Sequence, residues 1–91
     1  EELPLLLRDF SYAPQNAAIA SRIGLAYYLQ TDLQNAHRYL QKAVELGPTV
    51  ADYSVYLALI LEKLERFEEA LAEVRRGLSH SPEHPELLAL Q

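Results

Sequence analysis

The chain has 91 residues, which allow one small hydrophobic core, because chains divide into separate cores only beyond about 250 residues. Hydrophobic residues make up 49% and charged residues 23%, a composition that excludes a disordered tail, and the absence of cysteine excludes a disulfide framework. The formal net charge of -5 argues against nucleic-acid binding, and no apolar run approaches the roughly 20 residues of a membrane span.

Residues 3–14 are predicted to form a short helix that flanks the rest of the chain. This segment contains Leu5, Leu6 and Leu7, and three consecutive leucines cannot share one buried face of a helix. The run therefore either covers the following unit within one chain or mediates self-association of two copies. The chain starts at Glu1 without an initiator Met, which suggests a processed product or an excised fragment.

Residues 17–50 are predicted to form a pair of helices. Apolar residues recur there at three- and four-residue spacing, and Thr31-Asp32 interrupts them with residue types that favour turns and helix N-caps. The second helix is expected from Leu33 to Leu46. Gly47-Pro48 ends it, because Gly accepts a left-handed cap and Pro does not continue a helix.

Residues 51–84 repeat this architecture. Thr49 is expected to cap the first helix of the unit, and Arg66 marks the break before the second. Residues 85–91 are predicted to begin one more helix.

The two units are related by an offset of 34 residues. Small residues fall on small ones and large on large, although only four positions are identical. The identical pairs are Ala17 with Ala51, Leu25 with Leu59, Ala36 with Ala70 and Pro48 with Pro82.

This pattern resembles the tetratricopeptide repeat, whose signature is W-x2-L-G-x2-Y, then A-x3-F, then P, at a period of 34. In the first unit the signature positions hold Ala20, Ile23, Gly24, Tyr27, Ala36, Leu40 and Pro48. In the second unit they hold Ser54, Leu57, Ala58, Leu61, Ala70, Val74 and Pro82. The resemblance implies an all-α, helix-turn-helix solenoid of two repeat units with flanking helices, in one domain over residues 1–91.

The resemblance also implies a binding groove, because the first helices of successive units line a concave surface in this family. The implied lining is Ala18, Ser21, Arg22, Leu25, Tyr28, Leu29, Asp52, Val55, Tyr56, Leu59, Glu62 and Lys63. The family's carboxylate-clamp positions hold Ser21 and Leu25 here, so a clamp on a C-terminal carboxylate is not expected.

No catalytic, cofactor or metal site is expected. His80 and His84 flank a proline, which prevents the regular i, i+4 pair that binds metals, and no nucleophile, base and orienting group is discernible. The sequence therefore predicts a non-catalytic interaction module that binds a peptide or helix of a partner protein and no nucleic acid. The alternatives are a self-associating scaffold, as a homodimer or larger homo-oligomer, and a regulatory arm of a larger enzyme or secretion component.

Overall fold

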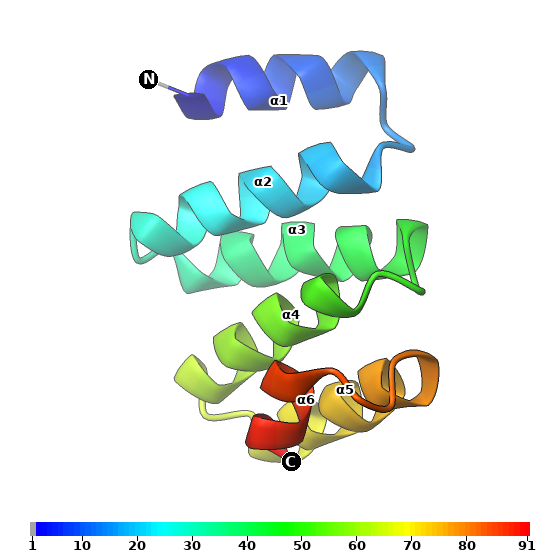
Figure 1. Ribbon diagram of the computed structural model, residues 1–91. Helices are drawn as coiled ribbons and strands as arrows, with labels where there is room; N and C mark the ends of the chain where they lie inside the picture. Colours follow the sequence, from blue (N-terminus) through cyan, green and yellow to red (C-terminus); the bar gives the residue numbers. More distant parts are fainter. Residues whose placement is uncertain (1) are drawn as a thin grey trace.

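A computed structural model describes residues 2–91, so Glu1 lies outside the described residues. The helices, stacked from one end to the other in Figure 1, are α1 (Glu2–Tyr12), α2 (Ala17–Leu29), α3 (Leu33–Leu46), α4 (Ala51–Lys63), α5 (Phe67–His80) and α6 (Pro85–Leu90). No strand occurs among residues 2–91, and none of the helices there has the length and apolarity of a membrane span. The predicted all-α solenoid is confirmed.

The same turn ends the first helix of each unit. Thr31 and Glu65, 34 residues apart, are the non-glycine residues with positive φ, at 58° and 61°. After Thr31 the N–H of Asp32 donates to the Tyr27 carbonyl at 3.0 Å, and the equivalent bond in the second unit measures 2.9 Å. These backbone bonds satisfy the last carbonyls of α2 and α4 and turn the chain towards the next helix.

The helix starts differ between the units. The side chains of Asn16 and Asp32 each accept a hydrogen bond from the backbone N–H three residues on, at 3.0 Å and 3.2 Å, and so cap α2 and α3. The expected cap at Thr49 is wrong, because the N-cap of α4 is Val50, whose side chain makes no capping hydrogen bond.

Small side chains bring α2 and α3 into close contact. Ala20, Ala36 and Leu40 are fully buried between them. At the edge of this interface Tyr27 stacks on Tyr39 with ring centroids 5.8 Å apart, which extends the packed surface towards α1.

The flanking helices cover the two ends of the stack. Leu3 and Leu6 of α1 are buried with Ile23 of α2, whereas Leu5 is 52% exposed and Leu7 is half-buried. The expectation that the leucine run lacks a buried face is therefore wrong, since Leu3 and Leu6 lie one turn apart on a buried face. Leu6 is not available for the predicted self-association.

Candidate interaction surface

Five side chains of α2 and α4 form an exposed apolar band. In α2 they follow the i, i+3, i+4 spacing that places residues on one helix face, and in α4 they follow i, i+3. Leu29 is 81% exposed and Leu59 is 37% exposed, and the other three are half-buried. The apolar band consists of Leu25, Tyr28, Leu29, Tyr56 and Leu59.

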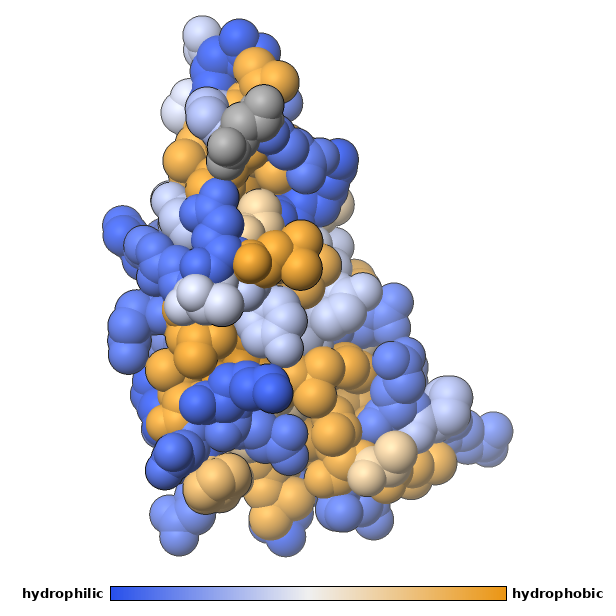
Figure 2. All heavy atoms as spheres, turned by 90° about the vertical axis from the view of Figure 1, so that its left-hand side faces the viewer, coloured by the Kyte–Doolittle hydropathy of each residue, from blue (hydrophilic) through white to orange (hydrophobic). Residues whose placement is uncertain are grey.

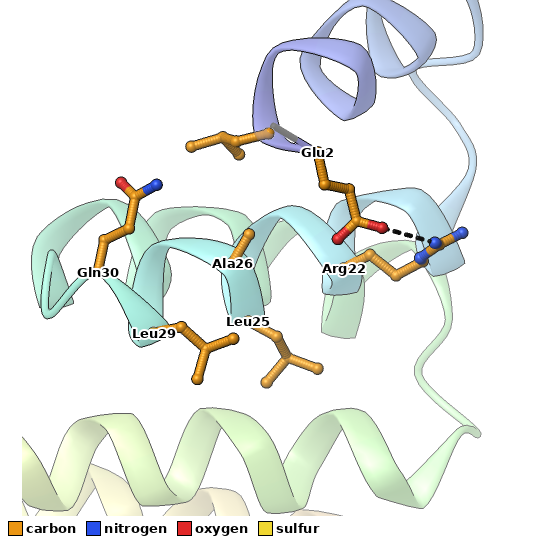
Figure 3. Close-up of a pocket in the computed structure, with 7 residues that line it drawn as sticks. Glu2, Arg22, Leu25, Ala26, Leu29 and Gln30 are labelled. Carbon is orange, nitrogen blue, oxygen red and sulfur yellow. Dashed lines mark hydrogen bonds and ion pairs between the residues drawn. The ribbon is translucent and has the colours of Figure 1, made fainter.

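A cavity of about 520 Å³ lies between α1 and α2 at one side of the apolar band. Figure 3 shows Leu25 and Leu29 on the α4 side of the helix, with Ala26 and the side chain of Leu3 on the α1 side. The walls of the cavity are therefore largely aliphatic.

One ion pair stands at the edge of that cavity. Arg22 donates to the Glu2 carboxylate at 3.1 Å and links α2 to α1 (Figure 3). Both side chains are about 60% exposed, at 60% and 63%, so solvent screens the pair and its contribution to stability is small. Its main effect is to place a paired positive and negative charge beside an apolar surface.

Two further hollows share residues with the first. A hollow of about 30 Å³ lies between α2 and α4, and all of its walls are apolar or aromatic, namely Leu25, Tyr28, Tyr56, Leu59 and Ile60. The other, of about 360 Å³, is lined by Tyr28, Leu29, Thr31, Leu33 and Lys63.

The shared residues make these hollows one surface. Leu25 borders the first two, Tyr28 borders the second and third, and Leu29 borders the first and third. Figure 2 shows hydrophobic side chains exposed on the side of the molecule where α2 and α4 end. An extended or helical segment of another polypeptide can therefore contact the band without interruption.

The structure removes two residues from the predicted groove lining. Ser21 is 5% exposed, and its hydroxyl donates to the Ala18 carbonyl at 2.9 Å. Val55 is 3% exposed and packs in the core with Ala58. Neither side chain offers surface to a partner, because one falls on the α2 face that packs inward and the other on the inward face of α4.

The predicted charged residues lie around the apolar band and do not form one cluster. Arg22 is paired with Glu2, Glu62 is exposed, and Asp52 lies 2.9 Å from His84. The contribution of α1 to the largest cavity is a feature that sequence reasoning missed. No signal identified it, because α1 has no counterpart in the 34-residue repeat.

Comparison with known proteins connects this geometry to a family. The family model described as the tetratricopeptide repeat matches residues 21–85. DnaJ homolog subfamily C member 7 of Homo sapiens is 33% identical over 72 residues, which are 79% of this chain and 15% of that protein. The protein of the same name in Mus musculus is 35% identical over 75 residues, again 15% of its length.

Solved structures share the fold over nearly the whole chain. MamA AMB-1 superposes with a TM-score of 0.84 at 27% identity, covering 97% of this chain and 48% of that one. MamA MSR-1 superposes with a TM-score of 0.80 at 27% identity, covering 97% of this chain and 51% of that one. The chain therefore spans about half of these structures and a much smaller part of the curated relatives.

Proposed function

The chain belongs to the tetratricopeptide repeat family, a family of protein–protein interaction modules, and we propose that it binds a peptide or helix of a partner protein along the apolar band. The proposal assigns the module a non-catalytic role. The observation that supports it is the continuity of the three hollows through Leu25, Tyr28 and Leu29.

The energetics favour an apolar anchor in the partner. Leu29 exposes most of its side chain to water, and covering a leucine gains roughly 1.5–3 kcal/mol. Tyr28 and Tyr56 add rigid aromatic surface, which is enriched among the residues that dominate binding energy. A partner segment with two or more large apolar side chains on one face fits this surface.

The surrounding charges act on orientation and association rate. Lys63 borders one end of the band, and the pair of Arg22 and Glu2 borders another. Exposed charges of this kind change the rate of association and suppress wrong partners more than they add affinity. We therefore expect binding to depend weakly on salt and strongly on the apolar side chains.

Self-association through the leucine run has less support. Leu6 is buried against Ile23, so α1 covers α2 within one chain. Leu5 alone keeps a largely exposed side chain in this run.

The proposal is tested by selecting peptides of about 12 residues from a random library against the 91-residue chain and measuring their affinity for two variants. Leu29→Ser removes an apolar side chain of the band, and Tyr12→Ser removes an equally exposed one, also 81%, from α1. Both positions are exposed, so both variants are expected to fold. Leu29→Ser should weaken binding about tenfold or more, and Tyr12→Ser should leave it unchanged.

A double variant extends the test to the second repeat. Tyr28→Ala/Leu59→Ala removes one side chain from α2 and one from α4, and circular dichroism verifies its fold. Loss of binding supports a site shared by the two units. Wild-type affinity in this variant contradicts the proposal.

A further inference from the structure

Three metal-ligating side chains converge where α6 meets α4. Asp52 lies in the first turn of α4, His84 is the N-cap of α6, and Glu86 lies in the first turn of α6. One ligand atom of each lies within 4.8 Å of the other two. The closest pair is His84 Nε2 and Asp52 Oδ1, at 2.9 Å, contributed by residues 32 positions apart in the sequence.

The donor set is typical of a borderline transition metal. An imidazole nitrogen and carboxylate oxygens bind zinc at about 2.0–2.2 Å, so ligand atoms around one ion lie up to about 4 Å apart. Small rotations of the two exposed carboxylates bring all three atoms into that range. Magnesium and calcium prefer oxygen ligands alone, so the imidazole favours zinc over them.

The histidine is held in place before any ion arrives. Its side chain is 17% exposed, and it sits directly before Pro85, the first residue of α6. Leu87, one turn further on, is fully buried and fixes α6 against the rest of the stack. Asp52 is 59% exposed, which leaves the group open to ions in solution.

We propose that Asp52, His84 and Glu86 bind one zinc ion that links α6 to α4. The ion replaces a single contact, between His84 and Asp52, with three metal–ligand bonds. Zinc binding therefore stabilises the docked position of α6.

Two features limit the affinity. His84 Nδ1 is buried and has no hydrogen-bond partner among the described residues, whereas the free ring nitrogen of a zinc-bound histidine usually donates to an acceptor that strengthens the site. The partial positive charge at the start of α4 also opposes a cation. We expect a dissociation constant on the order of 1–100 µM, weaker than that of closed structural zinc sites.

The test is calorimetric titration of the 91-residue chain with zinc chloride at pH 7.5. The wild type should bind one ion, and the melting temperature should rise with zinc. Asp52→Asn and Glu86→Gln should each weaken binding at least tenfold. Glu83→Gln and His80→Gln, at exposed neighbouring positions outside the group, are the matched controls and should bind as the wild type does.

Three results overturn the proposal. The first is no zinc binding by the folded wild type up to about 1 mM, a concentration that detects a weak site. The second is unchanged affinity in Glu86→Gln or Asp52→Asn, which means that a different set of residues holds the ion. The third is equal binding of magnesium, which means that the imidazole takes no part.

Discussion

Gly24 of α2 faces Leu40 of α3 so closely that a β-carbon on Gly24 would lie 2.6 Å from Leu40 Cγ. It would also lie 3.2 Å from the Ala36 carbonyl oxygen, which belongs to backbone that cannot move without shifting α3. The small residue therefore sets the distance between the two helices.

We expect Gly24→Leu to overpack this interface and to lower the free energy of unfolding by about 1–3 kcal/mol. Urea denaturation followed by circular dichroism measures the change. Ala18→Leu, at an exposed position of the same helix, is the control and should change stability little. An unchanged midpoint for Gly24→Leu would refute the close pairing of α2 and α3.

Glycine should stabilise the chain at the two turns that end α2 and α4. Thr31 and Glu65 adopt left-handed backbone, which costs residues with a β-carbon about 1–2 kcal/mol. After the entropy that glycine loses on folding is subtracted, Thr31→Gly and Glu65→Gly should each raise the free energy of unfolding by roughly 0.5–1 kcal/mol. Thermal melts check this.

Ala72→Gly is the control for that prediction. Ala72 is exposed in the middle of α5, where glycine costs about 0.5–1 kcal/mol relative to alanine. Destabilisation by all three glycine substitutions would contradict the positive φ angles.

Stability should fall as the pH drops below about 6.5, and His37 should account for part of the loss. Burial lowers the pKa of His37 from its ordinary value of 6.5, and the neighbouring positive charge of Arg66 lowers it further. The unfolded chain then binds a proton more readily than the folded chain. The stabilising effect of the uncharged ring is present above pH 6.5 and is lost as the pH falls through 6.5 towards the folded-state pKa.

Urea midpoints of the wild type and His37→Gln at pH 7.5 and pH 5.5 measure this contribution. The substitution removes the titrating group, so the variant should lose less stability between the two pH values. An identical loss in both proteins would show that His37 does not couple to folding.

Leu87 should anchor α6 to the stack although α6 has only six residues. Its side chain is fully buried, in a cluster with Val55 and Val74 of α4 and α5. Leu87→Ala should cost about 2–5 kcal/mol, whereas Leu88→Ala, at a position that is 47% exposed, should cost well under 1 kcal/mol. Equal effects would mean that α6 does not dock as the structure describes.

Much of the fold was predictable because helix patterning is local. Thr31-Asp32 and Gly47-Pro48 lie at the ends of helices as their turn chemistry predicts, and α6 begins at Pro85 as expected. The N-cap of α4 was not predictable from residue preference. Thr49 is a good capping residue, but the helix begins one position later, after Val50.

The site was only partly predictable because burial depends on the three-dimensional packing of neighbouring helices. The repeat places Ser21 and Val55 on the binding helices, but their exposure depends on the angle between those helices, which the period does not encode. The convergence of Asp52 and His84 depends on how α6 docks against α4, and no sequence spacing indicates it.

The most direct test of the apolar band is a nuclear magnetic resonance titration of the isotope-labelled 91-residue chain with a library-selected peptide. The account predicts that the largest chemical-shift changes fall on Leu25, Tyr28, Leu29, Tyr56 and Leu59, with little change along the exposed surface of α5. Changes concentrated on α3 and α5, with the apolar band unaffected, would contradict it.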